Sequence, residues 1–393
     1  MNILVIIHNQ SSTGPFFKVR EMCVAISDVG NTVSLLCTSE NARFRIKRYS
    51  YKNIQIIEAP DILWGKFRQG IDVWNSFIRI LIVRNIKIDI VHIIDSRPVV
   101  IIPALYLKYF RSLPIVMSWY DYFSIDGTIL ERSGILYSRT FGRVEQYFDR
   151  FFRKNANSSI AVTKFLQNKL IDLGIPKESI SIIPVGCVYK EYPENKNNKN
   201  IFNFKKHTST SDKLLCYAGN IFGNDKQLLI NSLTQIIKIN KTNNIKTILI
   251  GNHILPKSLI KDLNIIVTGR LNTIEEVYAY LRSCHYGIIP MMLSQANLAR
   301  WPSKIGDYFC AGLPVITTPV SDFKEIFDQY HLGFVSTTDS SESICNSIEE
   351  AFNIEEKQYK ILSMNCRKYA QNNLEWSVLS KNIIKCYNYS MNN

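Results

Sequence analysis

Short apolar runs alternate with amphipathic segments along the first half of the chain. Residues 2–7 form a nearly continuous apolar run, as expected of a strand that is buried on both faces of a sheet. A polar loop around Gly14 follows, and the helical period of residues 16–29 ends at Gly30, which tolerates a positive φ. The same rhythm returns at residues 32–38, 54–58, 88–94, 98–110, 114–118 and 159–162. This order of strands and helices, with short connections, predicts a doubly wound parallel sheet.

A polar break at residues 189–212 separates this series from a second one. Short apolar runs beyond the break predict strands at residues 214–217, 247–250, 265–267, 287–290 and 315–317. Helical periods occupy residues 226–237, 273–283, 302–311 and 376–389. The chain therefore predicts two Rossmann-like α/β halves, and open sheets of this kind bind ligands at the carboxyl ends of their strands.

The composition is that of an ordinary packed globular protein. Of the 393 residues, 46% are hydrophobic and 20% are charged, and the mean hydropathy is −0.04. No apolar run approaches the roughly 20 residues that span a bilayer. Residues 1–8 read as a first strand and not as a signal peptide. We therefore expect a cytoplasmic protein that is neither secreted nor membrane-spanning.

The cysteines and histidines indicate neither a disulfide framework nor a zinc site. The nine cysteines are odd in number and widely spaced, without a Cys-x-x-Cys pair, and the six histidines are equally dispersed. This pattern predicts reduced cysteines that are buried as small hydrophobic residues.

The net charge of +14 is unevenly distributed, with +10 over residues 1–190 and +4 over residues 191–393. Most of the excess in the first half comes from arginine. A basic half suggests an anionic neighbour, namely nucleic acid, a phospholipid surface or a phosphorylated substrate. The alternative explanation of the positive charge is a general enrichment in lysine throughout the chain, unrelated to any partner. Nucleic acid is not expected, because no helix-turn-helix, RNA-binding aromatic or zinc motif accompanies the charge.

Several segments together resemble the GT-B glycosyltransferases related to retaining glycosyltransferase family 4. The resemblance includes residues 89–92, 159–166, 182–186, 215–220 and 267–270. Its most specific part is the stretch from Arg300 to Ile316, which reads RWPSKIGDYFCAGLPVI. This stretch is similar to the branch of the family whose donor motif reads Pro-Ser-Lys, followed by an acidic residue, a tyrosine and Gly-x-Pro-Val.

The resemblance implies the GT-B architecture, with two Rossmann-like parallel-sheet domains facing each other across a cleft. Residues 1–188 would form the N-terminal, acceptor-side domain, and residues 189–212 the linker. Residues 213–370 would form the C-terminal domain that binds the nucleotide sugar. Residues 371–393 would form a helix that crosses back to the N-terminal domain.

The Pro-Ser-Lys stretch predicts a phosphate site at the start of a helix. Pro302 suits the first helical position, and Ser303 and the free amides of the first turn favour an anion. Arg300 and Lys304 would add two cations that bind a diphosphate. Asp307 lies one turn further on, and the resemblance implies that its carboxylate accepts hydrogen bonds from the ribose hydroxyls of the nucleotide. The alternative is a solvated helix end in which these charged side chains form an i/i+3 salt bridge.

The resemblance assigns further residues to the donor site. One lysine is expected to contact the phosphates, a glycine loop to approach them closely, and an acidic residue to lie near the nucleotide. These residues are Gly14, Gly219, Asn220, Lys226, Gly269 and Glu325. Gly14 is alternatively a turn residue, and Glu325 an ordinary surface acid.

Three departures from the family pattern limit what it implies about mechanism. The paired glutamates of the family would fall at Ala299 and Asp307, so the first acid is absent. The arginine that usually follows the strand-end glycine is Asn220. The His-Asp pair at the cleft edge of the first domain is Tyr120-Asp121 here, so only the aspartate remains.

The resemblance implies a front-side displacement with retention, in which the donor phosphate takes the acceptor proton. Lys226, Arg300 and Lys304 would then favour the charge that develops on the leaving group. Lys226, Lys304 and Asp121 are therefore the candidate catalytic residues. Asp121 either orients the acceptor hydroxyl, or caps a turn or pairs with a nearby arginine. His92, after an apolar run, is expected to be structural.

The expected partners are a nucleotide-sugar donor and an oligosaccharide or lipid-linked acceptor. The chain lacks an Asp-x-Asp pair at a strand end, and we expect neither a cofactor nor a required metal.

Basic residues interleaved with aromatic ones between residues 64 and 154 suggest peripheral attachment to an anionic membrane on its cytoplasmic side. The alternative is that these helices pack on the sheet. The predicted activity is sugar transfer in bacterial surface-polysaccharide assembly, as of O-antigen or capsule; a non-catalytic GT-B-like partner subunit and a sugar-nucleotide epimerase are the alternatives.

Overall fold

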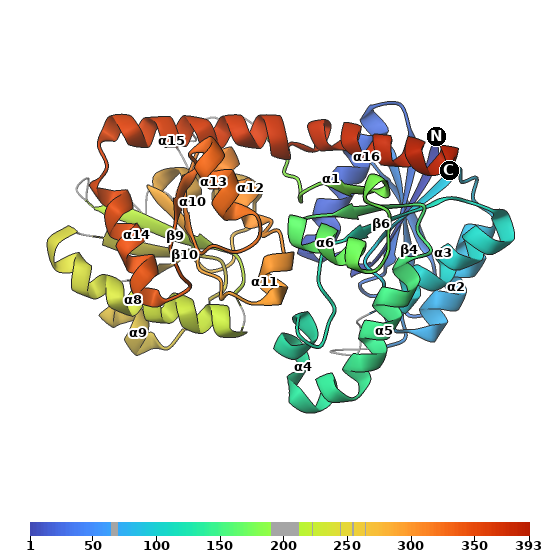
Figure 1. Ribbon diagram of the computed structural model, residues 1–393, viewed down its shortest axis with the longest axis horizontal. Coiled ribbons are helices and arrows are strands. Elements are labelled where there is room, and N and C mark those ends of the chain that lie inside the picture. The colour runs from blue at the N-terminus through green and yellow to red at the C-terminus, as the bar shows by residue number, and fades with distance from the viewer. Residues whose placement is uncertain (64–69, 190–211, 222, 244, 254, 264) are drawn as a thin grey trace. The chain divides into compact units, whose positions relative to one another are not determined.

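The computed structural model describes the chain except for residues 64–69, 190–211, 222, 244, 254 and 264 (Figure 1). The chain divides into two compact units. Unit 1 comprises Met1–Gly186, Ala299–Trp301 and Glu375–Asn393. Unit 2 comprises Cys187–Leu298 and Pro302–Leu374. The polar break at residues 189–212 lies almost entirely outside the described residues.

Unit 1 contains an eight-stranded sheet in the order β3-β4-β2-β1-β5-β6-β7-β8. Every neighbouring pair is parallel except β3 and β4, which are antiparallel. The strands are β1 (Asn2–Gln10), β2 (Thr32–Thr38), β3 (Lys47–Tyr51), β4 (Ile54–Ala59), β5 (Ile90–Ile94), β6 (Ile115–Trp119), β7 (Ser158–Ala161) and β8 (Ile180–Ile182). The sequence pattern did not predict β3, because this polar strand lies at the edge of the sheet and none of its side chains is buried.

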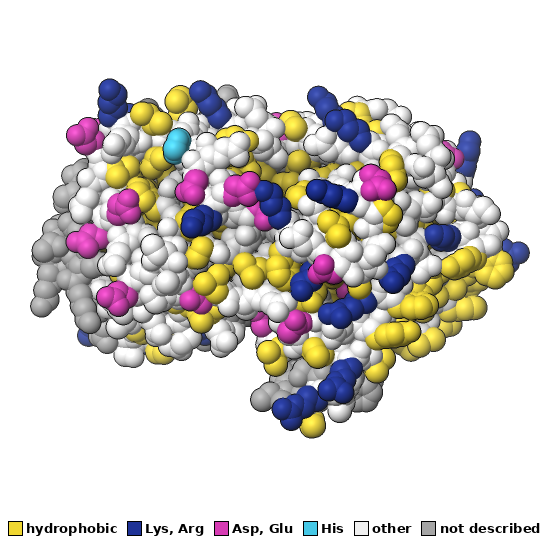
Figure 2. All heavy atoms as spheres, in the orientation of Figure 1, with side chains coloured by type: hydrophobic (Ala, Val, Ile, Leu, Met, Phe, Trp, Pro, Cys, Tyr) yellow, Lys and Arg dark blue, Asp and Glu magenta, His cyan; other side chains and the backbone are white. Residues whose placement is uncertain are grey.

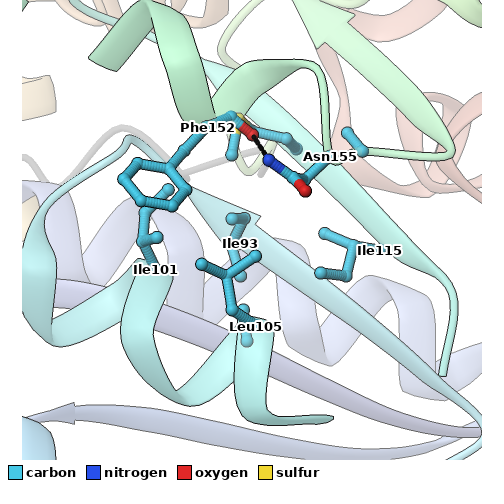
Figure 3. A pocket seen from close by; sticks show the side chains of 9 residues that line it. Ile93, Ile101, Leu105, Ile115, Phe152 and Asn155 are labelled. Atoms are coloured by element: carbon cyan, nitrogen blue, oxygen red, sulfur yellow. Dashed lines mark hydrogen bonds between the residues drawn. The ribbon is translucent and has the colours of Figure 1, made fainter. Parts of the chain in front are cut away.

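The helices of unit 1 pack on its sheet or on one another. The helices are α1 (Gly14–Asp28), α2 (Val73–Arg84), α3 (Pro98–Arg111), α4 (Thr128–Arg139), α5 (Phe141–Arg153), α6 (Lys164–Asp172) and α16 (Trp376–Asn392). The inner sides of α2 and α3 share a core cluster with β1, β5 and β6. At the end of α5, Phe152 closes a small apolar pocket together with Ile101 and Leu105 of α3 (Figure 3). Helices α2, α3 and α5 therefore lie on one side of the sheet, each turning one side toward this core.

The C-terminal helix α16 packs against α1 and contacts β6 and β7. His92 of β5 is fully buried there, with Nδ1 2.8 Å from the Tyr387 hydroxyl and Nε2 2.7 Å from the Ser118 hydroxyl. Burial lowers the pKa of His92 to about 3, so the imidazole is neutral at physiological pH. The structural role expected of His92 is confirmed.

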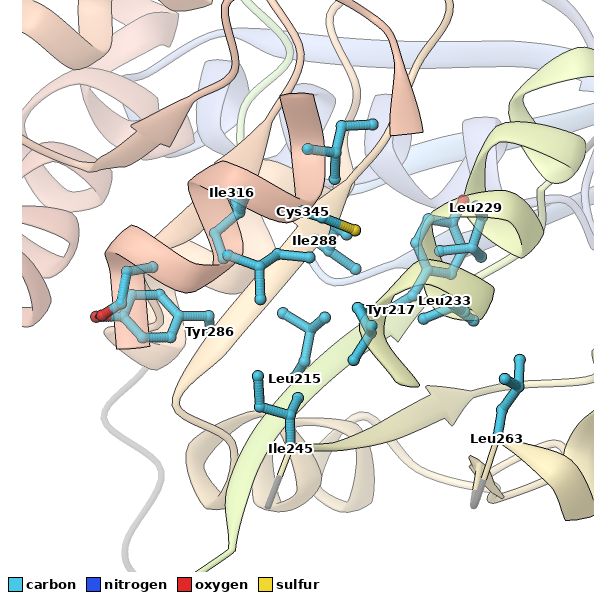
Figure 4. Close-up of a cluster of buried hydrophobic side chains, with 14 of the residues drawn as sticks. Leu215, Tyr217, Leu229, Leu233, Ile245, Leu263, Tyr286, Ile288, Ile316 and Cys345 are labelled. Carbon is cyan, nitrogen blue, oxygen red and sulfur yellow. The ribbon is translucent and has the colours of Figure 1, made fainter. Parts of the chain in front are cut away.

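Unit 2 contains a six-stranded, wholly parallel sheet in the order β11-β10-β9-β12-β13-β14. The strands are β9 (Lys213–Ala218), β10 (Ile245–Ile250), β11 (Ile265–Val267), β12 (Tyr286–Ile289), β13 (Val315–Thr317) and β14 (Gly333–Val335). The helices are α8 (Gly223–Asn243), α9 (Lys257–Asp262), α10 (Ile274–Ser283), α11 (Gln295–Ala299), α12 (Lys304–Ala311), α13 (Phe323–Tyr330), α14 (Ser341–Asn353) and α15 (Glu356–Tyr369). The core between the strands and helices α8 and α14 includes Leu215, Leu229, Leu233, Ile288 and Cys345 (Figure 4).

Helix α12 begins two residues later than the sequence predicted. Ser303 is the N-cap, with φ −58° and ψ −24°, and its side chain does not cap the helix. Pro302 therefore precedes the helix, where its carbonyl accepts a hydrogen bond from Ile305 N at 3.0 Å. The prediction of Pro302 at the first helical position was wrong, because the chain forms a single tighter i→i+3 turn before the α-helix starts.

Two features of the described residues bear on the protein class. All nine cysteines are buried thiols that form no disulfide. In the parts of the chain that the structure describes, no helix is both long enough and apolar enough to cross a bilayer.

Candidate active site

In unit 2, candidate residues gather where the strand order reverses. Strands β10 and β11 extend the sheet to one side of β9, and β12, β13 and β14 extend it to the other. The turn after β9 and the first turns of α8 and α12 contribute to the carboxyl edge at this point. Doubly wound sheets bind ligands at such a reversal, because the two neighbouring loops leave in opposite directions.

Lys304, the first residue of α12, is held by an aromatic side chain of β9. Its Nζ donates a hydrogen bond to the Tyr217 hydroxyl and lies 3.8 Å from the centre of the same ring. Burial lowers the pKa of Lys304 to about 7, while the carboxylates of Asp225 and Asp307 oppose this shift. Lys304 is therefore partly buried against Tyr217 and not fully solvated, while its attraction to Asp307 agrees with the i/i+3 pairing of the alternative interpretation. A bound diphosphate would favour the protonated form of the amine.

The first turn of α8 brings a second lysine to the same place. Asp225 Oδ1 accepts hydrogen bonds from Met292 N at 2.8 Å and Asn297 Nδ2 at 3.0 Å, which fix the start of α8 to the segment after β12. The next residue, Lys226, acts electrostatically on His253, as Lys304 does. Both lysines are therefore near enough to His253 to lower its pKa.

His253 was missed by the sequence analysis. Its ring meets Tyr217 edge to face at 5.7 Å, and Nε2 lies 3.3 Å from the carbonyl oxygen of Ile250. Burial is the largest cause that lowers the pKa of His253, and Lys304 and Lys226 lower it further. The available signal was its position three residues after the apolar run of β10.

The turn after β9 has the geometry expected of its glycine. Gly219 has φ +85°, a conformation that side chains disfavour, and its amide donates to Ile250 O at 2.9 Å. Asn220 O accepts a hydrogen bond from the Tyr217 hydroxyl at 3.0 Å. Gly269, with φ +70°, forms a bridge to Gly251. These turns place exposed backbone at the ends of β9, β10 and β11.

The two acidic residues assigned to the donor differ in their surroundings. Asp307, in the first turn of α12, interacts electrostatically with Lys304 and with the buried Tyr278 of α10. Glu325 lies on the exposed first turn of α13, beside Lys324 in a shallow open depression. The carboxylate of Asp307 thus acts on Lys304, whereas Glu325 lies on the exposed side of α13.

In unit 1, the strand order reverses between β1 and β5. Helix α1 begins there at Gly14, where an added Cβ would meet no atom within 4 Å. Asp95, directly after β5, is buried and has φ +61°, which is rare for a residue other than glycine. Its Oδ1 accepts a hydrogen bond from Tyr120 N at 3.3 Å.

Asp95 is the second residue that the sequence analysis missed. Burial, and after it the nearby Asp121, raise the pKa of Asp95 to about 7, while Arg153 opposes the shift. Its signal in the sequence is that it is the first acidic residue after the apolar run of β5.

Asp121 pairs with an arginine, as one of its alternative interpretations held. Arg300 Nε lies 3.3 Å from Asp121 Oδ1, and Arg300 Nη2 lies 2.7 Å from Glu131 Oε2. The adjacent Ala299 is fully buried, and its carbonyl accepts a hydrogen bond from the Thr163 hydroxyl at 3.2 Å. Two carboxylates of unit 1 neutralise Arg300, and a phosphate-binding role for it stays a prediction.

A metal centre is not evident in the described residues. Within them, no three His, Cys, Asp or Glu side chains gather as metal ligands do. The groups that could hold an anionic ligand are instead the two lysines and the exposed amides at the helix starts of unit 2.

Comparisons with known proteins connect both units to sugar transfer. Residues 19–188 match the family described as Glycosyltransferase Family 4, and residues 212–353 match the family described as Glycosyl transferases group 1. No curated protein sequence matches the chain.

Solved structures share the whole architecture at low sequence identity. Sucrose-phosphate synthase from Thermosynechococcus elongatus is 12% identical with a TM-score of 0.73, covering 99% of this chain and 98% of its own. WaaG, a glycosyltransferase involved in lipopolysaccharide biosynthesis, is 16% identical with a TM-score of 0.65, covering 97% and 98%. Anabaena HepE in complex with UDP-glucose is 14% identical with a TM-score of 0.67, covering 99% of each chain. The expected GT-B fold is thereby confirmed.

Proposed function

The chain belongs to the glycosyltransferases with the GT-B fold, and on this premise we propose that it transfers a hexosyl group from a nucleotide sugar to a lipid-linked saccharide. The observation that carries the proposal is the pair of lysines at the strand reversal of unit 2. Lys304 and Lys226 act on one imidazole, from the first turns of two helices whose amides also favour anions.

The lysines would act on the leaving group. As the bond between the sugar and the donor phosphate breaks, negative charge develops on the nucleoside diphosphate. The ammonium groups of Lys304 and Lys226 stabilise this charge more in the transition state than in the ground state, which accelerates the reaction. Asp307, one turn into α12, would accept hydrogen bonds from the ribose.

We propose retention of the anomeric configuration. The acceptor oxygen attacks from the face that the diphosphate leaves, and its proton passes to an oxygen of the departing phosphate. No side-chain base is then required. Asp121 would orient the acceptor hydroxyl when the acceptor replaces part of its pairing with Arg300.

The likeness to WaaG and the excess positive charge of residues 1–190 support a role in bacterial surface-polysaccharide assembly at the cytoplasmic face of the membrane. A lipid-linked acceptor suits that place, since the donor arrives from solution and the acceptor stays in the bilayer.

A panel of nucleotide sugars tests the proposal. We expect one donor class to raise the melting temperature, because a ligand at about 100 times its Kd stabilises the folded state by about 2.7 kcal/mol. The same donor should release its nucleotide in the presence of a membrane-lipid extract. Absence of donor binding across the panel would favour a non-catalytic subunit, and conversion of the donor to an epimer without transfer would favour an epimerase.

We expect transfer to proceed without a divalent metal. The two lysines and the helix amides neutralise the diphosphate, which is the task that a metal ion would otherwise perform. Initial rates in EDTA should match those in Mg²⁺ or Mn²⁺. Complete loss in EDTA that either ion restores would contradict this expectation.

A further inference from the structure

Helices α2, α3 and α5 of unit 1 are apolar on their outer sides as well as on their inner sides. Nine large hydrophobic side chains are between 40% and 81% exposed along them. They are Val73, Phe77 and Leu81 on α2, Ile102, Tyr109 and Phe110 on α3, and Val144, Tyr147 and Phe151 on α5. We call this surface the α2–α3–α5 face.

The spacing of these residues makes the exposure systematic. On α2 they recur every fourth residue, and on α5 at intervals of three and four, so each set forms one stripe along its helix. Helices α2 and α3 contact each other, and Tyr109 of α3 donates a hydrogen bond to Asn155 Oδ1 just after α5 at 2.7 Å. Figure 2 shows a band of hydrophobic side chains over the region where Figure 1 labels these helices. A band of this extent on a folded protein marks an interaction surface.

The charges along the face are of one sign. The three helices contain two acidic residues, and both are paired with arginines: Glu145 with Arg97, and the buried Asp149 with Arg153. Arg79 and Arg153 are buried, and the other cations within or just after the helices are Arg84, Lys108, Arg111, Arg143, Arg150 and Lys154. The face is therefore apolar with a cationic margin.

From this combination we infer that the α2–α3–α5 face docks on the surface of an anionic lipid bilayer. Exposed aromatic and aliphatic side chains enter the interfacial region while cations meet lipid phosphates, as in helices that lie in the membrane plane. Two copies of the chain fit the face less well, since a symmetric contact would bring its cations together without carboxylates to pair with them. This inference deepens the proposed function, because it names the surface that brings the enzyme to a lipid-linked acceptor.

Vesicle co-sedimentation of the full chain, without donor or acceptor, tests the inference. We expect binding to vesicles of phosphatidylcholine mixed with phosphatidylglycerol, and little binding to phosphatidylcholine alone. Phe110→Asp combined with Val144→Asp should lower the partition coefficient by about tenfold or more, because each places an anion where an apolar group entered the bilayer. Arg84→Gln and Arg143→Gln should each lower it about fivefold, and rising salt should weaken the binding of the unaltered chain.

Matched controls come from unit 2. Ile361 of α15 is 44% exposed, and Ile361→Asp should leave vesicle binding unchanged, as should Lys357→Gln on the same helix. Equal vesicle binding by the Phe110→Asp, Val144→Asp variant and the unaltered chain would overturn the inference. So would a concentration-dependent dimer, seen by sedimentation, that this variant dissociates. Donor binding is measured separately by thermal shift, so a failure here is distinguishable from a failure of the proposed transfer.

Discussion

Replacing Lys304 or Lys226 by alanine is expected to lower kcat/KM for sugar transfer by about 100-fold or more. Each substitution removes a cation from the place where the leaving diphosphate would gain charge. Because that charge grows as the sugar–phosphate bond breaks, most of the loss should appear in kcat. Steady-state kinetics with a donor identified by thermal shift gives the measurement.

Two further variants separate charge from packing. Lys304→Met keeps a long side chain against the Tyr217 ring but removes the positive charge, so it should lose about as much activity as Lys304→Ala. Lys257→Ala removes an exposed lysine at the start of α9 and should leave kcat/KM unchanged. Near-normal turnover of both Lys304→Ala and Lys226→Ala would remove these lysines from the phosphate site.

Asp95→Asn is expected to stabilise the protein at about pH 8 and to have little effect at about pH 4. Folded Asp95 keeps its proton up to a pKa of about 7, whereas the unfolded chain releases it near the ordinary value of 3.8. The folded state therefore binds more protons between these values, and the free energy of unfolding falls as the pH rises through this range. Asparagine removes the cost of ionisation and can still accept the hydrogen bond from Tyr120 N. At about 1.4 kcal/mol per pKa unit, the gain is on the order of a few kcal/mol.

Asp89→Asn provides a control with the opposite sign. The hydrogen bond from Asn2 N, at 2.7 Å, is the largest cause that lowers the pKa of Asp89. Its carboxylate therefore stabilises the folded state above its unfolded pKa, and this contribution is lost as the pH falls through the folded pKa. Asp89→Asn should destabilise at neutral pH. Urea unfolding at about pH 4 and about pH 8 gives the free energy of unfolding of both variants and of the unaltered chain. Equal stability of Asp95→Asn and the unaltered chain at about pH 8 would show that Asp95 is not held protonated.

The strands of both sheets were predictable wherever burial requires a run of apolar residues in the sequence. Strands β1, β5 and β10 are covered on both faces, so their residues are apolar almost without interruption. Edge strand β3 has no apolar run, because its polar side chains stay accessible to solvent. The start of α12 was misplaced by two residues for a similar reason: proline and serine favour the beginning of a helix at several adjacent positions, and only the backbone conformation distinguishes them.

Part of the candidate site was likewise predictable from the sequence, and part depends on the tertiary structure. The sequence alone predicted which residues would bind a nucleotide sugar, since Lys304 and Asp307 lie in a local motif and Lys226 follows a strand by a short turn. Only the tertiary structure decided that Tyr217 contacts Lys304 and that both lysines act on His253. It also decided that Asp121 acts on Asp95 and that carboxylates neutralise Arg300. Their chemistry depends on which strand ends become neighbours and on how much water burial removes. Both are properties of contacts between residues far apart in the chain, which no local pattern encodes.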